Sequence, residues 1–331
     1  MQRQESILSW LMTVFPGLSP ELAPVGADAS FRRYFRVRLA DGEHYIVMDA
    51  PPQHEDCMPF VRVAALFAAA GVRVPQVLER NLAEGFLLLS DFGDTTYLSV
   101  LDAGNAQTLY QQAIMALVRI QTASRPGLLP PYDRALLECE LQRFPDWYLA
   151  RHLQVEPDAA AQQRMRQVFA RLLDNSTGQP QVWVHRDYHS RNLMVIDDGP
   201  GILDFQDAVC GPITYDLVSL LKDAYIEWEE ERVLDWAIRY WENARKAGLP
   251  VSADFAQFYR DFEWMGVQRH LKVLGIFARL YYRDGKAGYL ADMPRVLGHV
   301  RKTVARYPEL APLGPLLDVW HGQSAQDGFT F

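Results

Sequence analysis

The first ninety residues combine short alternating runs with two stretches of helical spacing. Apolar and polar positions alternate, or short apolar runs are bounded by turn residues, in four segments that predict β-strands: 34–39, 44–48, 74–78 and 85–89. Asp41-Gly42 lies between the first two runs and predicts a hairpin turn. Helical spacing at 7–15 and 58–70 predicts a helix before the sheet and one inserted into it. We therefore expect a small mixed sheet with helices at the N-terminal end of the chain.

Beyond residue 94 the pattern becomes mainly helical. Long segments with a helical period occupy 105–123, 134–153, 159–175 and most of 214–306. Three short apolar runs interrupt them and predict strands separated by polar loops: 182–184, 193–196 and 201–203. The pattern predicts an α+β protein with two lobes, a small mixed-sheet lobe over 1–92 and a larger, mostly helical lobe over 93–331.

Composition and charge narrow the function classes. Of the 331 residues, 49% are hydrophobic and 22% are charged, which is typical of a globular protein. The net charge of −8 argues against a nucleic-acid partner, because phosphate backbones attract basic surfaces. Cys57, Cys139 and Cys210 are distant and odd in number, which favours a reducing compartment. No apolar run is long enough to span a membrane. We expect a cytoplasmic enzyme with no membrane partner.

One polar segment, residues 182–208, places three oxygen-bearing side chains in short loops between predicted strands. His185-Arg186-Asp187 is followed by Asn192 five residues after the aspartate, and Asp204 lies twelve residues further on. Phosphoryl transfer uses one aspartate to orient or deprotonate the acceptor hydroxyl, and an asparagine and a second aspartate as hard ligands for Mg²⁺. Loops that leave neighbouring short strands can converge at one point. The segment therefore predicts a kinase-type centre.

These motifs carry a resemblance to a known family. The pattern HxDxHxxN at 185–192, followed by LDF at 203–205, resembles the aminoglycoside phosphotransferase and choline kinase branch of the protein-kinase-like superfamily. The wider pattern includes GADASFRRYFR, MDAPP and LDFQDAVCGPITYDLVSLLKDAY. It most resembles the anomeric amino-sugar kinases of bacterial cell-wall recycling, which phosphorylate N-acetylmuramate and N-acetylglucosamine at C1. The resemblance covers nearly the whole chain and implies a kinase-like fold with ATP and Mg²⁺.

The resemblance also implies roles for single residues. It makes Asp187 the catalytic base, with Asn192 and Asp204 as magnesium ligands. It implies a nucleotide site in the N-terminal lobe, built from these residues: Ser30 and Arg32 over the phosphates, and Leu89 and Asp91 in a hinge against the adenine. It implies that Asp216 holds the catalytic loop through its backbone. Candidates for contact with the acceptor sugar are His189, Arg143 and Arg269.

Two features depart from the family pattern. Asp91-Phe92-Gly93 spells DFG but precedes the catalytic loop, so we interpret it as hinge and not as a metal site. Met48 stands where the family has a strand lysine for the α and β phosphates, and methionine cannot donate to phosphate. Either an arginine from the set Arg32, Arg33 and Arg36 supplies the charge, or nucleotide affinity is modest. Glu55 and Asp56 are candidates for the acidic partner, although a solvated helix start explains them too.

Several functions remain open at this point. The preferred one is an ATP-dependent kinase of an amino sugar, working as a monomer. An aminoglycoside or other small-alcohol phosphotransferase is a second, and a nucleotide-binding regulatory pseudokinase is a third, permitted by Met48. A zinc hydrolase using His185, His189 and Asp204 would be a rival chemistry, but the general base of an HExxH motif is missing. The sequence leaves open the acceptor pocket and the choice between ATP and GTP.

Overall fold

The computed structural model describes residues 2–27 and 31–327, and divides the chain into two compact units. Unit 1 comprises Met1–Asp102 together with Arg191–Asp207, and unit 2 comprises Ala103–Ser190 and Ala208–Phe331. The expected lobes, 1–92 and 93–331, differ from these units because the segment 191–207 joins the N-terminal part of the chain.

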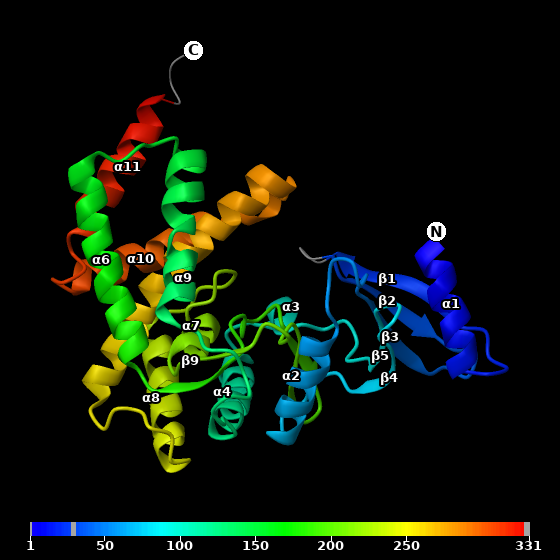
Figure 1. Ribbon diagram of the computed structural model, residues 1–331. Coiled ribbons are helices and arrows are strands. Elements are labelled where there is room, and N and C mark those ends of the chain that lie inside the picture. The colour runs from blue at the N-terminus through cyan, green and yellow to red at the C-terminus, as the bar shows by residue number, and fades with distance from the viewer. Residues whose placement is uncertain (1, 28–30, 328–331) are drawn as a thin grey trace. The chain divides into compact units, whose positions relative to one another are not determined.

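Unit 1 is built on a five-stranded sheet with the order β1-β2-β3-β5-β4, in which every neighbouring pair is antiparallel, so the expected mixed sheet was wrong in this respect. Figure 1 shows these strands side by side in blue and cyan: β1 Glu21–Ala27, β2 Arg33–Arg38, β3 His44–Asp49, β4 Val77–Asn81 and β5 Phe86–Ser90. The predicted hairpin is confirmed, with Arg38 opposite His44 and Gly42 at φ 91° in the turn.

Two strands of this sheet differ from the sequence expectation. β1 was not predicted, because Pro24 and Gly26 are poor strand formers. It lies at the edge of the sheet, where a missing backbone donor is tolerated. β4 begins at Val77 rather than at Val74, because Val74 is followed by Pro75.

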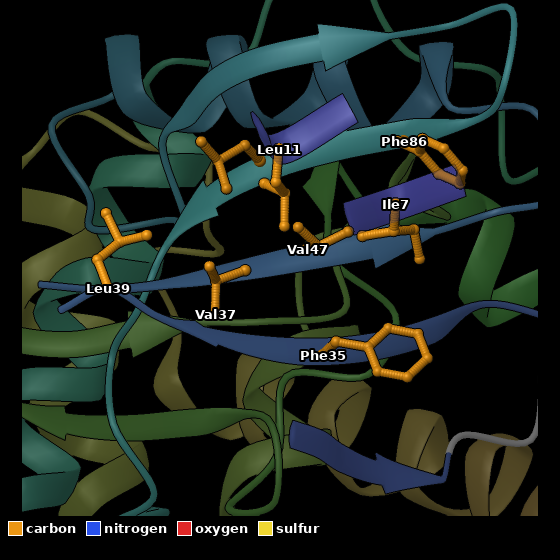
Figure 2. Close-up of a cluster of buried hydrophobic side chains, with 8 residues drawn as sticks. Ile7, Leu11, Phe35, Val37, Leu39, Val47 and Phe86 are labelled. Atoms are coloured by element: carbon orange, nitrogen blue, oxygen red, sulfur yellow. The ribbon is translucent and has the colours of Figure 1, made fainter. Parts of the chain in front are cut away.

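Helix α1, Gln2–Val14, covers one face of this sheet with its apolar side. Figure 2 shows Ile7 and Leu11 from this helix lying over Val37 and Val47 of the central strands. All four side chains are fully buried, so the helix and sheet share one core. Burial of four aliphatic side chains stabilises this packing by roughly 1.5–3 kcal/mol each.

A second hairpin completes unit 1. Strands β7, Leu193–Ile196, and β8, Gly199–Ile202, pair antiparallel. Their backbones bond to the N-terminal part of the unit: Ile202 N–H donates to the Arg73 carbonyl at 2.8 Å, and Val195 N–H to the Thr95 carbonyl at 2.8 Å. These bonds explain why residues 191–207 belong with the sheet. The helices of unit 1 besides α1 are α2 Met58–Ala69 and α3 Tyr97–Val100.

Unit 2 is mostly helical, as predicted, with one two-stranded ladder between β6, Gln181–Val184, and β9, Val209–Pro212. Its helices are α4 Ala106–Thr122, α5 Arg134–Leu141, η1 Phe144–Leu153, α6 Ala159–Gly178, α7 Tyr215–Leu221, α8 Glu230–Lys246, α9 Phe255–Asp284, η2 Ala287–Asp292, α10 Met293–Arg306 and α11 Leu313–Asp327. Most of the central residues of helix α9 are buried, so this helix contributes a large part of the core of the unit. Among the described residues, no helix has both the length and the apolar character needed to cross a membrane.

The expected helix over 134–153 is in fact two elements. An α-helix covers Arg134–Leu141, and a π-helix follows from Phe144 to Leu153. Pro145 lies at this junction and lacks the backbone donor that a continuous α-helix would use. Gly275 of α9 packs so closely against the Arg143 carbonyl group that a Cβ atom would overlap it. Close packing at this point fixes the region around Glu140 and Arg143 against α9.

Candidate functional site

The loop that follows β6 carries Asp187, and its backbone is held by a buried carboxylate. Asp216, in the first turn of α7, accepts hydrogen bonds from His185 N–H at 2.6 Å and Arg186 N–H at 3.0 Å. Arg186 has φ 78°, a left-handed conformation that is costly for a residue with a side chain. The two bonds from Asp216 stabilise this strained turn. They place Asp187 at its tip with a side chain that is 46% exposed.

A buried arginine of α9 contacts the same loop. The Arg269 guanidinium lies 3.5 Å from the Asp187 carboxylate and donates to the Arg186 carbonyl at 2.6 Å. Desolvation raises the pKa of Asp187, but the positive charges of Arg269 and Lys272 lower it by more. The pKa of Asp187 therefore lies well below its usual range. Asp187 is therefore ionised at neutral pH and can accept a proton or a hydrogen bond.

Beneath this loop lies a fully buried acid, Glu140 of α5. Its carboxylate pairs with the Arg186 guanidinium and with Lys272 Nζ at 3.0 Å, and accepts a hydrogen bond from the Tyr132 hydroxyl. Lys272 in turn donates to the Tyr215 hydroxyl at 2.9 Å. We call these residues with Arg269 the buried ion cluster: Tyr132, Glu140, Arg186, Tyr215, Arg269 and Lys272. The cluster fixes both the side chain and the backbone of Arg186.

Glu140 and Lys272 were not among the predicted site residues, although the sequence around each of them indicates a buried charge. Glu140 shares one helical face with Leu137, Leu141 and Phe144, all of which are fully buried. Charged residues are almost never fully buried without a partner, so a glutamate at such a position predicts a buried cation nearby. Lys272 is likewise a charged residue among the buried residues of α9, which predicts a buried acid nearby.

Acid should weaken the buried ion cluster. Burial raises the pKa of Glu140, but Lys272 and Arg186 lower it by more, to about 2. Because the pKa of Glu140 is lower in the folded than in the unfolded protein, its ionised carboxylate stabilises the fold. This contribution to the free energy of unfolding is complete well above the unfolded pKa and is lost as the pH falls towards about 2. We expect about 1 kcal/mol of stability to be lost through Glu140 between about pH 5 and 3.5.

Urea unfolding of wild type and Glu140→Gln over that pH range measures this loss. The variant should be less stable at neutral pH by about 3 kcal/mol, because it leaves buried cations unpaired. Its stability should also depend less steeply on pH. Parallel pH profiles for the two proteins would contradict the assignment.

The candidate metal ligands Asn192 and Asp204 lie at neighbouring ends of the β7–β8 hairpin. Asn192 directly precedes β7, and Leu203 N–H donates to its carbonyl at 2.9 Å. The Asn192 side-chain amide lies 3.5 Å from the Asp204 carboxylate, which also accepts from Gln206 at 2.7 Å. The predicted convergence of these two residues is therefore present within unit 1.

Asp204 is held in an unusual backbone conformation. Its φ is 60°, in the left-handed region that few residues other than glycine, asparagine and aspartate adopt. The next residue, Phe205, is fully buried and packs against Phe60 and Phe67 of α2 with ring centroids 4.7 and 6.0 Å apart. The apolar anchor fixes the turn and leaves the Asp204 carboxylate 36% exposed.

This donor set suits a magnesium ion that is carried by a nucleotide. Mg²⁺ prefers oxygen ligands and is held by one or two protein groups when phosphates and water supply the others. Asn192 and Asp204 offer one amide and one carboxylate oxygen source on adjacent turns. Over residues 2–27 and 31–327 no group of three or more His, Cys, Asp or Glu side chains could hold a metal ion by itself.

A cavity of about 380 Å³ in unit 1 lies next to these ligands. Its apolar wall consists of Val25, Ile46, Phe60, Pro75, Leu89, Phe92, Met194, Leu203 and Phe205, and its polar lining includes Tyr34, Arg36, Ser90, Asp91, Arg191, Asn192 and Asp204. An apolar cavity with a few polar groups at one side is typical of a small-molecule site. The predicted hinge residues Leu89 and Asp91 both line it, and so do the candidate metal ligands.

Asp91 is paired within the wall of this cavity. Its carboxylate forms an ion pair with Arg36 of β2 and accepts a hydrogen bond from Gly93 N–H at 2.8 Å. Arg36 also contacts Asp94 at 2.7 Å. The DFG sequence at 91–93 therefore ties the end of β5 to β2.

The remaining predicted site residues are Ser30, Arg32, His189 and Arg143. Ser30 lies outside the described residues. Arg32 directly precedes β2, and its guanidinium lies 3.9 Å from the Asp204 carboxylate. In unit 2 the His189 ring contacts Tyr225 edge-on at 5.3 Å between centroids. Arg143 lies 3.7 Å from Glu140 with a side chain that is 25% exposed.

Comparisons with known proteins agree with this geometry. A model of the phosphotransferase enzyme family matches residues 21–255. The N-acetylmuramate/N-acetylglucosamine kinase of Neisseria meningitidis serogroup B is 50% identical over 336 aligned positions, which cover 100% of both chains. The kinase of the same name from Pseudomonas aeruginosa is 53% identical over 90% of this chain and 88% of its own length.

Solved structures show the same fold at low identity. An aminoglycoside phosphotransferase bound to ADP has a TM-score of 0.57 and 12% identity, covering 89% of this chain and 97% of its own. A type I macrolide 2'-phosphotransferase has a TM-score of 0.59 and 14% identity over 89% of this chain and 97% of its own. The expected protein-kinase-like fold is thus confirmed. Since the family model matches most of the chain and a relative that is 50% identical covers all of it, the chain belongs to the phosphotransferase enzyme family.

Proposed function

We propose that the protein transfers the γ-phosphate of ATP to the anomeric hydroxyl of N-acetylmuramate and N-acetylglucosamine, in the recycling of peptidoglycan. One observation carries the choice of acceptor: the 50% identity over the whole of both chains to a kinase named for these two sugars. The fold neighbours that act on aminoglycosides are only 12–17% identical, and at that distance they support the fold alone. An acidic chain with three free cysteines also fits a cytoplasmic enzyme.

In this proposal each part of the site has one task. The apolar cavity binds the adenine, with Leu89 and Asp91 in its hinge wall. Asn192 and Asp204 would hold Mg²⁺, which when bound neutralises charge on the phosphates. Asp187 accepts the proton of the sugar hydroxyl as the new bond to phosphorus forms and the bond to the ADP oxygen breaks.

We place the acceptor sugar against the aromatic residues beside the catalytic loop. His189 contacts Tyr225, which contacts Phe277, which in turn contacts Tyr289 of η2. Asp223 joins this segment to the loop, because its carboxylate accepts from the backbone and hydroxyl of Ser190. Aromatic faces of this kind pack against the apolar face of a sugar ring.

N-acetylmuramate has a lactyl carboxylate that N-acetylglucosamine lacks. An enzyme that accepts both sugars therefore needs a cation only to assist the binding of that carboxylate. Arg143 and Arg269 are the candidates, and their environments separate them. The Arg269 side chain is 6% exposed and already contacts Asp187, which suits a residue that positions the base. The Arg143 side chain is 25% exposed, which suits contact with a ligand.

Product analysis by phosphorus NMR tests the choice of acceptor. With ATP, Mg²⁺ and free N-acetylglucosamine or N-acetylmuramate, we expect an anomeric phosphate. The 1-O-methyl glycoside lacks the anomeric hydroxyl and should not react. Efficient phosphorylation of that glycoside, or of an aminoglycoside alone, would overturn the proposal.

A further inference from the structure

Met48 leaves the nucleotide phosphates without the expected strand lysine. Its side chain is 1% exposed in β3, opposite Tyr34 and two residues beyond Ile46, so it shares the sheet face of two residues that line the cavity. In protein kinases a lysine of the third strand, paired with a helix glutamate, holds these phosphates. A thioether has no hydrogen-bond donor. The positive charge must therefore come from another residue.

Three arginines near the start of β2 could supply it, and the structure separates them. Arg33 pairs with the buried Asp49. Arg36 pairs with Asp91 in the wall of the cavity and also with Asp94. Of the three, Arg32 is the one that reaches a candidate metal ligand.

Arg32 lies between two carboxylates that belong to different elements. Its Nη1 atom is 3.4 Å from Glu55 Oε2, and its Nη2 atom is 3.9 Å from Asp204 Oδ1. The Arg32 and Glu55 side chains are only 13% and 19% exposed. An arginine side chain is always protonated in proteins. A desolvated cation is thus held beside the carboxylate assigned to the metal.

Glu55 lies in the segment that joins β3 to α2, three residues before that helix begins, whereas the kinase glutamate lies on the helix after the third strand. It is nevertheless the acid that contacts the candidate phosphate-binding cation, as the helix glutamate does in the kinases. A planar guanidinium can bind phosphate oxygens with two parallel hydrogen bonds.

We infer that Arg32, oriented by Glu55, replaces the strand lysine and binds the phosphates of the nucleotide beside Asp204. The inference rests on the proposed ATP-dependent function and names the residue that does this part of the binding. It also explains how a chain with methionine at position 48 can keep an intact set of Asp187, Asn192 and Asp204.

Binding of nucleotides of different phosphate content tests the role of Arg32. Calorimetric titration of the full-length protein with adenosine, AMP and Mg-ADP gives the affinity for the base and for the phosphates separately. We expect Arg32→Ala to weaken Mg-ADP binding by about 10- to 100-fold, the usual effect of losing a charged hydrogen bond. Adenosine should bind within about twofold of wild type, because the apolar cavity is unchanged.

Two further variants separate charge from position. Arg32→Lys should recover only part of the Mg-ADP affinity, because an ammonium group makes single rather than paired contacts. Glu55→Gln should weaken Mg-ADP binding by about 3- to 10-fold, because the guanidinium loses its orienting partner. Arg38→Ala removes the same charge from an exposed position at the other end of β2 and serves as the control. It should bind all three ligands as wild type does.

Two results would overturn the inference: Mg-ADP binding by Arg32→Ala at wild-type affinity, or an equal loss of Mg-ADP and adenosine binding, which would indicate general damage to the cavity. The acceptor plays no part in these titrations. A wild-type protein that binds Mg-ADP but phosphorylates no amino sugar would contradict the proposed function and leave the role of Arg32 standing.

Discussion

Asp187→Asn should lower kcat by about 10²- to 10⁴-fold while Mg-ADP binds as it does to wild type. The substitution keeps the size of the side chain and a hydrogen bond to the acceptor, but it removes the group that accepts the proton. It also removes the negative charge that faces Arg269 at 3.5 Å. Steady-state kinetics with N-acetylglucosamine, together with calorimetric titration of Mg-ADP, would measure both effects.

The matched control for this variant is His189→Asn in the same loop. His189 contacts Tyr225 and is assigned to the acceptor, so its loss should raise KM for the sugar more than it lowers kcat. Turnover near the wild-type rate in Asp187→Asn would remove this residue from the mechanism. A loss of nucleotide binding in the same variant would show that the substitution disturbs the fold.

Asp204→Ala should weaken Mg-nucleotide binding by about 100-fold or more and abolish its dependence on Mg²⁺. Asn192→Ala should have the smaller effect, about 10-fold, because a neutral amide contributes less to holding a dication. Titration of ADP with and without Mg²⁺ gives the affinities directly. If both variants keep the wild-type difference between ADP and Mg-ADP, the metal assignment is wrong.

Two other aspartates test the specificity of that result. Asp91→Ala should keep the metal dependence, because its carboxylate pairs with Arg36 in the lining of the cavity. Asp198→Ala removes an exposed charge from the β7–β8 hairpin, where it contacts Arg73 at 2.9 Å. It should bind Mg-ADP normally. A metal effect at Asp91 would move the magnesium site from Asp204 to the DFG segment.

The order and spacing of the site residues could be predicted because they lie close together in sequence. Asp187, Asn192 and Asp204 fall within loops bounded by short apolar strands, and the structure shows Asn192 and Asp204 converging as expected. Local sequence determines such loops. The fold class followed in the same way from a change of hydrophobic period near residue 94.

Long-range pairing could not be predicted in the same way. β9 has the sequence Val-Cys-Gly-Pro, which has little strand propensity, and it forms because its backbone finds β6 as a partner. β1 likewise forms against β2 despite Pro24. The Arg32–Glu55 contact joins residues 23 positions apart. From the sequence alone, Arg32, Arg33 and Arg36 were equal candidates for the phosphate-binding cation.

The insertion of residues 191–207 into unit 1 has a consequence for the order in which the protein folds during synthesis. The sheet β1–β5 is complete once residue 90 has left the ribosome, but the wall formed by Met194, Leu203 and Phe205 is still missing. The backbone carbonyls of Arg73 and Thr95 likewise lack their hydrogen-bond partners, Ile202 and Val195, until a hundred or more further residues have been made. The nascent N-terminal sheet therefore exposes an unfinished apolar surface while residues 103–190 are being made, and transiently exposed apolar surface of this kind is prone to aggregation.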